Sequence, residues 1–281
     1  MKYLNLAAAS LAAFVAVPAA AQETAPPKAV TVTGSVALVS DYRLRGVSQT
    51  DKEMAVQGGL TIAHESGVYV GAWASNLSGW GTFGGSNMEL DLIGGYKMPI
   101  SGGAIDVGLT WYMYPGGASK TDFAEPYVKL SGTAGPVSLL AGVAYAPKQQ
   151  ALGKWYTGGA AYATGIPTRP GAKSDNLYLW GDFSGAIPTT PLTAKAHIGY
   201  SDGNSGLGPN GTSVAPTGKY VDWLVGADFA VPSTPLTVGI AYVDTNITKA
   251  ESAYLLPNFS STKNGSSIAS GKVVFSVTAA F

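Results

Sequence analysis

The feature that most restricts this chain is a two-residue alternation of apolar and polar side chains. In residues 192–202, Ile198 and Tyr200 share one face with small apolar residues, whereas Lys195 and His197 point to the opposite face. Because successive side chains of a β-strand point to opposite faces, this is the pattern of a strand between two environments. The face that carries Lys195 and His197 requires water, and the other face does not.

The same alternation, followed along the chain, predicts twelve strands. We expect them near 31–42, 55–64, 68–76, 88–98, 104–114, 123–133, 137–146, 175–187, 192–202, 220–230, 236–246 and 272–281. Long connections (43–54, 77–87, 115–122, 147–174, 203–219 and 247–271) alternate strictly with short ones (65–67, 99–103, 134–136, 188–191 and 231–235). Outer-membrane barrels have short periplasmic turns and longer extracellular loops. The sequence therefore predicts an all-β fold, a transmembrane antiparallel up-and-down β-barrel.

The N-terminus has the features of a secretory signal peptide. Lys2 supplies a basic start, an apolar run covers 4–17, and an A-x-A cleavage site ends at Ala21. We therefore expect a signal peptide over 1–21, a Pro-rich periplasmic leader over 22–30, and an outer-membrane β-barrel over 31–281. This organisation predicts export to the outer membrane of a Gram-negative bacterium.

The composition limits other classes of protein. The sequence has no cysteine, a net charge of +0 and only 12% charged residues, against about 25% in an average soluble domain. Low charge is typical of a surface that faces lipid. No basic tract points to nucleic acid, and no ligand cluster points to a metal, so we expect neither partner and no cofactor.

Aromatic side chains on the apolar face gather near the strand ends. Tyr42, Tyr145, Tyr200 and Tyr242 lie near the outer ends, and Tyr96, Phe183, Phe229 and Phe281 near the inner ends. Such rings favour a boundary between lipid and water, so we expect two aromatic girdles. The terminal Phe281 also resembles the C-terminal strand signal that barrel-assembly machinery reads.

Several blocks resemble the TorF family of proteobacterial porin-like proteins. They are SVALVSDYRLRGVSQT at 35–50, AVQGGL at 55–60, ELDL at 89–92, YPG at 114–116, HIGYSDG at 197–203 and AYVDT at 241–245. The resemblance covers nearly all of the chain after the signal peptide, and residues 147–174 depart from it most. It implies an outer-membrane β-barrel that forms a pore, in a family whose substrates are undefined.

The polar face of the strands supplies candidate pore-lining residues. The acidic ones are Asp41, Glu89, Asp91, Asp106, Glu125, Asp182, Asp222 and Asp228, and the basic ones Arg43, Lys97, Lys129, Lys195 and Lys272, with His197 titratable. Eight acids against five bases favour a mild preference for cations. Alternatively, these charges pair across strands and fill space. Both interpretations stay open.

Asp41, Arg43 and Arg45 form the most concentrated charged cluster, at the outer end of the first strand. Because guanidinium groups bind carboxylates and phosphates in a planar fork, these residues are candidates to line the outer mouth and contact a solute. The alternative is an internal Asp–Arg pair that closes the barrel seam.

Three functions are compatible with this pattern. The sequence favours passive diffusion of small hydrophilic solutes through a porin-like channel. The second function is a non-conducting structural or adhesive barrel, with its lumen filled by side chains or narrowed by 147–174. The third, an outer-membrane hydrolase, is disfavoured because His64 lies at the periplasmic end near Ser66 and His197 has no serine nucleophile beside it. We therefore expect no catalytic residue.

The expected partners are outer-membrane lipid, barrel-assembly machinery and small hydrophilic solutes. The solute and the oligomeric state stay open.

Overall fold

The computed structural model describes residues 29–281. The predicted signal peptide over 1–21 and all but the last two residues of the leader over 22–30 lie outside the described residues.

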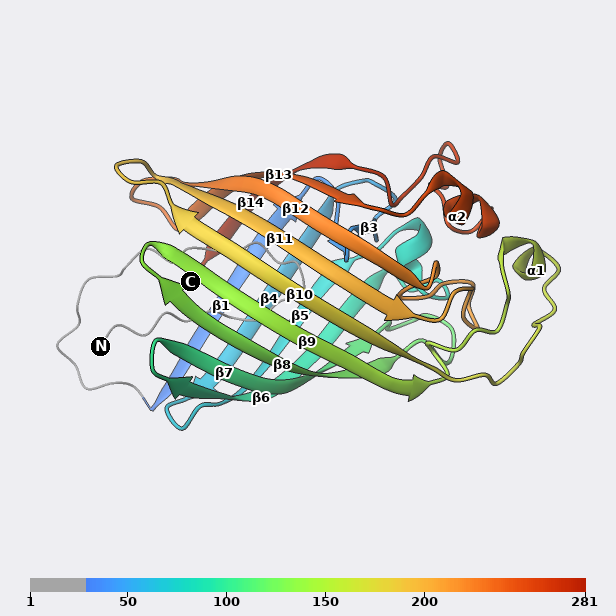
Figure 1. Cartoon of the computed structure of the whole chain (residues 1–281), viewed down its shortest axis with the longest axis horizontal. Coiled ribbons are helices and arrows are strands. Elements are labelled where there is room, and N and C mark those ends of the chain that lie inside the picture. Colours follow the sequence, from blue (N-terminus) through green and yellow to red (C-terminus); the bar gives the residue numbers. More distant parts are fainter. Residues whose placement is uncertain (1–28) are drawn as a thin grey trace.

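Twelve antiparallel strands close into a barrel in which each strand pairs with the next and the last pairs with the first (Figure 1). The strands are β1 (Val30–Val39), β4 (Ala55–His64), β5 (Val68–Asn76), β6 (Met88–Ile100), β7 (Gly103–Met113), β8 (Phe123–Ala134), β9 (Val137–Gln149), β10 (Ser174–Ala186), β11 (Leu192–Gly203), β12 (Lys219–Ala230), β13 (Leu236–Thr245) and β14 (Lys272–Ala280). The predicted barrel is confirmed. The predicted first strand is too long, because the chain leaves the wall after Val39 instead of continuing to residue 42.

Short turns gather at one end of the barrel and long loops at the other (Figure 1), which confirms the predicted alternation. The six long loops are L1 (40–54), L2 (77–87), L3 (114–122), L4 (150–173), L5 (204–218) and L6 (246–271). They contain the short strands β2 (Arg43–Leu44) and β3 (Val47–Ser48), the 3-10 turn η1 (Gly79–Thr82), and the helices α1 (Gly159–Ala163) and α2 (Lys249–Tyr254). In the part of the chain that the structure describes, no helix is long and apolar enough to cross a membrane.

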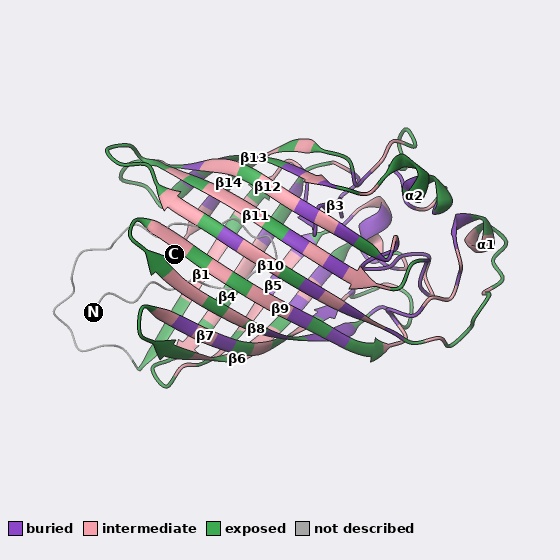
Figure 2. Ribbon diagram, in the orientation of Figure 1, coloured by how far each residue is buried: buried purple, intermediate pink, exposed green. Residues whose placement is uncertain are grey.

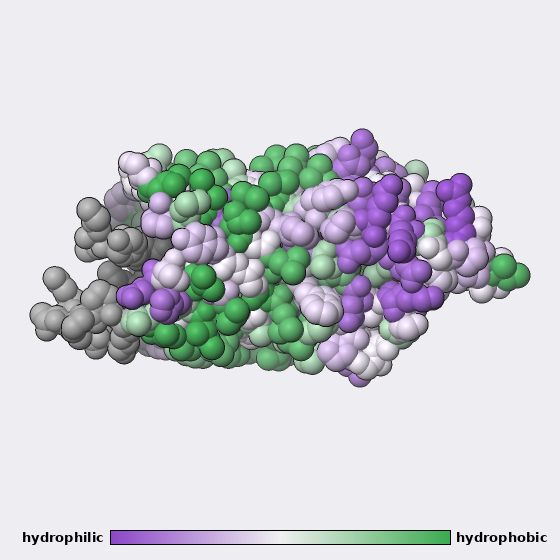
Figure 3. Space-filling view, turned by 90° about the horizontal axis from the view of Figure 1, so that it is seen from below, coloured by the Kyte–Doolittle hydropathy of each residue, from purple (hydrophilic) through white to green (hydrophobic). Residues whose placement is uncertain are grey.

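The outer wall of the barrel is apolar. Val36, Leu60, Val128, Val225 and Phe275 each expose 43–62% of their surface, and Figure 3 shows apolar residues over the barrel wall and hydrophilic ones over the loop end. In water this exposure would be unfavourable, whereas in a bilayer these side chains meet hydrocarbon. The outer face of the strands is therefore the lipid-facing surface.

The closing seam between β1 and β14 is shorter than the pairing on the other side of β1. With β4, β1 pairs from Val30 to Val39, whereas with β14 it pairs only from Ser35 to Val39. Below these pairs, the backbones of Gly34 and Phe281 exchange two hydrogen bonds of 2.8 and 3.0 Å.

L1 folds into the barrel. Every residue from Asp41 to Asp51 is buried, and buried residues gather towards the loop end of the barrel (Figure 2). Sequence reasoning considered 147–174 as the loop that narrows the lumen. In the structure L1 occupies the lumen, and L4 lies at the loop end, where its helix α1 is among the outermost elements (Figure 1).

Candidate constriction inside the barrel

The inserted part of L1 is a tight hairpin. Arg43 pairs with Ser48 and Leu44 with Val47, so Arg45 and Gly46 form a two-residue turn. Both have positive φ, 49° at Arg45 and 78° at Gly46, as in the turns that suit the twist of a β-hairpin. A Cβ on Gly46 would lie 2.4 Å from a methyl carbon of Thr245, so the turn requires glycine on steric as well as conformational grounds. We call residues 43–48 the L1 hairpin.

Arg45, in the turn of the L1 hairpin, contacts the opposite side of the barrel. Its Nη2 donates to both carboxylate oxygens of Glu125 on β8, at 2.8 and 2.7 Å, and its Cζ lies 4.2 Å from the centre of the Tyr178 ring on β10. Tyr112 on β7 donates to the same carboxylate at 3.3 Å. Because β8 and β10 stand opposite β1 in the strand order, the L1 hairpin connects two walls of the barrel.

Asp41 and Arg43 stabilise the hairpin from within. Arg43 Nε lies 2.8 Å from Asp41 Oδ2, and Ser48 Oγ donates to Asp41 Oδ1 at 2.6 Å. Arg43 Nη1 donates to the carbonyls of Gly46 and Ser270 at 2.9 and 2.8 Å. Asp41 and Arg43 therefore form an internal Asp–Arg pair within L1.

L6 holds the outer part of L1. The carboxylate of Asp51 accepts from the backbone N–H of Thr262 at 3.0 Å, and Lys272 Nζ donates to the Lys52 carbonyl at 2.6 Å. On the exposed rim, a hydrogen bond from Lys263 at 2.6 Å holds the pKa of Glu53 below its usual value. These contacts attach L1 to L6 and to the first residue of the closing strand β14.

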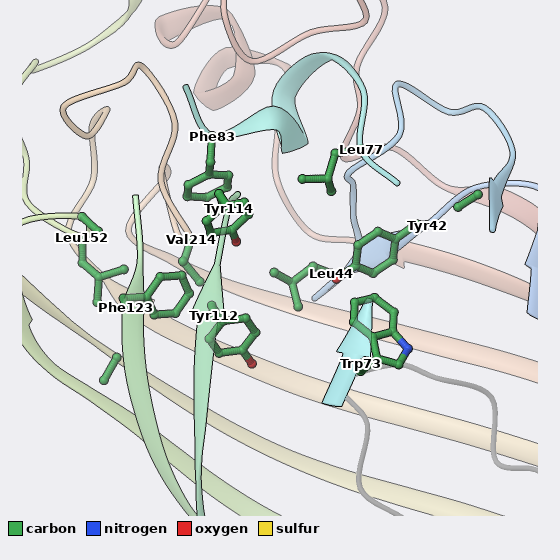
Figure 4. Close-up of a cluster of buried hydrophobic side chains, with 13 residues drawn as sticks. Tyr42, Leu44, Trp73, Leu77, Phe83, Tyr112, Tyr114, Phe123, Leu152 and Val214 are labelled. Carbon is green, nitrogen blue, oxygen red and sulfur yellow. The ribbon is translucent and has the colours of Figure 1, made fainter. Parts of the chain in front are cut away.

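Aromatic rings form one side of the constriction. Leu44 lies between the ring pair Tyr42–Trp73 and the rings of Tyr112 and Tyr114 (Figure 4). Tyr42 and Trp73 meet edge to face at 5.3 Å, a favourable geometry for aromatic rings. Apolar and polar contacts thus fix the hairpin together.

Glu89 and Asp91, on β6, are the acids of the constriction without a basic partner. Glu89 accepts from the Tyr42 hydroxyl at 3.0 Å, and the strand register places Asp91 between Trp73 and Tyr112. Within residues 29–281 neither carboxylate forms a salt bridge. They expose 0% and 1% of their surface. An isolated buried charge is costly, so the closely packed constriction disfavours the charged form of both carboxyls.

Beneath the hairpin, His197 lies between two acids. Its Nδ1 is 2.6 Å from Asp182 and its Nε2 is 3.2 Å from Asp222. The Tyr178 hydroxyl contacts the same Nε2 at 2.9 Å and donates to Asp222 at 3.2 Å. Tyr178 therefore connects the histidine cluster to Arg45, which packs against its ring.

Nearer the short turns, further charges are partnered. Lys195 lies 2.6 Å from Asp228, and Asp106 accepts from the Tyr69 hydroxyl at 2.7 Å. The Nζ of Lys129, which faces Asp106 in the strand register, lies 3.8 Å from the centre of the Tyr127 ring. In this part of the barrel, Lys195 and Asp228 thus form an ion pair between neighbouring strands, whereas Asp106 and Lys129 contact tyrosines.

The predicted pore-lining residues all lie inside the barrel. Asp41, Arg43, Arg45, Glu89, Asp91, Asp106, Glu125, Asp182 and Asp222 are buried, and Lys129, Lys195 and His197 are half-buried. The inner aromatic residues Trp73, Tyr112 and Tyr178 were not predicted as part of a site. Their signal in the sequence is an aromatic ring on the polar face of a strand.

One predicted girdle residue is wrong. Tyr42 exposes only 2% of its surface, because the strand alternation stops at Val39 and L1 then turns into the lumen. Tyr96, Tyr145, Tyr242 and Phe229 expose 38–46% and lie on the outer wall, Tyr200 is half-buried, and Phe281 exposes 73%.

His64 ends β4 and Ser66 lies in the exposed turn that follows, with His64 Nδ1 2.9 Å from Ser66 Oγ. This turn lies at the end of the barrel opposite the long loops, as the sequence analysis predicts.

The closed twelve-strand wall, the apolar outer face and the polar lumen define a β-barrel of the outer-membrane, porin-like class. The chain belongs to the family described as "Bacterial protein of unknown function (Gcw_chp)", whose model matches residues 21–281.

Among solved structures, the NanC porin shares the fold. The NanC porin is 10% identical and matches with a TM-score of 0.51, over 89% of this chain and 99% of that chain. An outer membrane channel from Pseudomonas putida F1 is 10% identical, with a TM-score of 0.43 over 92% of this chain and 100% of the other. No curated protein matches the chain. At these identities the likeness shows the fold alone.

Proposed function

We propose that the protein is an outer-membrane channel for passive diffusion of small hydrophilic solutes, with the L1 hairpin as its constriction. The single observation that carries this proposal is the contact of Arg45 with Glu125 and Tyr178. It holds a loop, and not the strands of the wall, across the lumen, so that a displacement of this loop would open the lumen. The resemblance of residues 35–60 to TorF-family porins supports the same function, since this block contains the hairpin.

The lumen on the periplasmic side of the hairpin is consistent with this function. Thr33 and Ser35 on β1 and Thr61 on β4 point inward and keep intermediate exposure, in contrast to the fully buried Glu89 and Asp91. Short hydroxyl side chains leave room for water. A solute from outside would therefore pass the hairpin and then enter a wider, hydrated space.

A mild preference for cations belongs to this proposal. Arg43, Arg45, Lys195 and His197 each contact an acid, so their charges are largely compensated. Glu89 and Asp91 are not compensated by a base in the described part of the chain. Acidic groups at a narrow point attract cations once water reaches and ionises them, so we assign the preference to this pair in the conformation in which the L1 hairpin has moved.

A second candidate is a non-conducting structural or adhesive barrel. The specific observation in its favour is the depth of burial at the hairpin, where Arg45 exposes only 4% of its surface. Burial of this degree closes the lumen in the present conformation, so conduction requires the hairpin to move or water to enter around it.

The deciding experiment is single-channel conductance of the folded full-length protein in planar bilayers. A second variant replaces residues 43–48 by a Gly-Ser linker. We expect small conductance steps for the unaltered protein and larger ones for the linker variant, because the linker removes the constriction. Each protein is first verified as folded by its gel shift on heating. If neither then conducts, the channel proposal is refuted and the structural barrel is supported.

Localisation and assembly follow as further parts of the proposal. Residues 1–21 would direct export, Phe281 would be read by the barrel-assembly machinery, and the lipid-facing wall would lie in the outer membrane of a Gram-negative bacterium.

A further inference from the structure

The loop end of the barrel contains a cavity of about 730 Å³, in the size range of ligand pockets. Residues from L2, L3, L4, L5 and L6 line it, so it lies at the outer mouth. None of these lining residues is charged. This composition contrasts with the charged constriction inside the barrel.

The polar groups of the cavity are neutral and include two fixed amides. Asn210 Nδ2 donates to the Ser119 carbonyl at 3.1 Å, and Asn258 Nδ2 donates to the Gly211 carbonyl. Because these bonds orient the amide nitrogens towards the protein backbone, the side-chain carbonyl oxygens remain as acceptors for hydroxyl groups. The Thr212 side chain adds a hydroxyl to the same lining.

Tyr162 supplies a half-buried aromatic ring to the lining, and the buried Tyr156 packs against it. The rings of Tyr156 and Tyr162 meet edge to face at 5.1 Å, and the Tyr162 ring lies against the backbone of Gly211. Tyr156 is fixed by two backbone hydrogen bonds of 3.0 Å with Leu207. Tyr156 also belongs to a buried apolar cluster that includes Leu255 and Phe259. The aromatic wall is therefore formed before any solute arrives.

The cavity adjoins the constriction. Phe83 and Ser213, chain neighbours of the lining residues Gly84 and Thr212, border a second space of about 10 Å³ against Leu44 and Val47 of the L1 hairpin. A solute held in the mouth would thus lie directly above the loop that narrows the lumen.

We infer that the mouth cavity binds a neutral polyhydroxylated solute of the monosaccharide or disaccharide class. Sugar rings have an apolar face that packs on tyrosine and hydroxyl groups that donate to amide oxygens. A charged solute would lose water without gaining a counter-charge. This inference rests on the proposed channel for its physiological role, but binding itself requires no conduction.

The test is calorimetric titration of the detergent-folded full-length protein with glucose, maltose, and sodium gluconate as a charged analogue. We expect saturable binding of at least one neutral sugar, with gluconate about ten-fold weaker or undetectable. Tyr162→Ala should weaken the sugar about ten-fold, the change that the loss of one aromatic contact produces. Tyr254→Ala is the matched control, because Tyr254 is 62% exposed on α2 and does not line the cavity.

Each variant is first verified as folded by its gel shift on heating. The absence of binding by folded protein overturns the inference, and gluconate binding as tight as sugar binding overturns the assigned class. Equal loss in both tyrosine variants shows that the site lies elsewhere. Because the readout is binding, a protein that binds sugar without conducting refutes only the channel, and a conducting protein that binds no sugar refutes only this site.

Discussion

Arg45 and Glu125 are 80 residues apart in the sequence, and Nη2 of the arginine lies 2.8 and 2.7 Å from the two carboxylate oxygens. Both side chains are buried, so neither charge can return to water if the other is removed. The contact holds the L1 hairpin against the far wall of the barrel.

Arg45→Ala is expected to weaken the folded barrel and widen the lumen. Breaking a buried ion pair by removal of one partner typically costs about 3–5 kcal/mol, and the released hairpin should raise the conductance. The double variant Arg45→Ala/Glu125→Gln should regain part of the stability, because the stranded charge is gone. Stability is measured by the temperature at which the unboiled band disappears; a double variant that loses the sum of both single effects would refute the coupling.

Glu89→Gln combined with Asp91→Asn should shift the reversal potential in a salt gradient towards anions. Within residues 29–281 the two side chains have no basic partner, so their replacement removes acidic groups from the constriction without freeing a base. Glu65→Gln is the control, because Glu65 is an exposed acid in the turn between β4 and β5. An unchanged potential in the double variant would show that other acids set the selectivity.

Gly46→Ala should displace the L1 hairpin. At φ 78° a side chain costs about 1–2 kcal/mol, and here the Cβ also meets Thr245. Gly116→Ala is matched to it, since Gly116 has φ 75° and nothing within 4 Å of an added Cβ. We expect similar backbone costs in both variants and altered conductance in the Gly46 variant alone. If both variants change the conductance to a similar extent, the position of the L1 hairpin does not determine the conductance.

Deletion of Phe281 should leave export intact and lower the membrane-inserted fraction. Its backbone closes the seam with Gly34, and its ring is 73% exposed on the outer wall. The measurement is the heat-modifiable fraction in outer membranes after a fixed induction. Phe281→Ala removes the ring but keeps the backbone hydrogen bonds with Gly34, so it distinguishes the contribution of the ring from that of the backbone seam. If the deletion inserts as efficiently as the unaltered chain, neither contribution matters for assembly.

The sequence predicted the wall of the barrel better than its contents. Strands such as 192–202 were predictable because alternation depends only on which face a residue occupies. The position of L1 was not, because the alternation ends at Val39 and nothing local tells whether a polar loop turns inward or outward. The pair Arg45–Glu125 requires both the strand order and this inward turn, so sequence reasoning identified the residues and not their contact.

The short seam has a consequence for how deep the protein lies in the bilayer. On the side of β14, strand β1 has no strand partner from Val30 to Thr33 in the described part of the chain. In hydrocarbon each unpaired backbone group costs several kcal/mol, so we expect this edge to lie among headgroups or water although Val30 and Val32 are apolar. The inner boundary of the membrane is then expected near the level of Gly34 and Phe281. The difference in length between β1 and β14 would thus determine how deeply the barrel sits in its membrane.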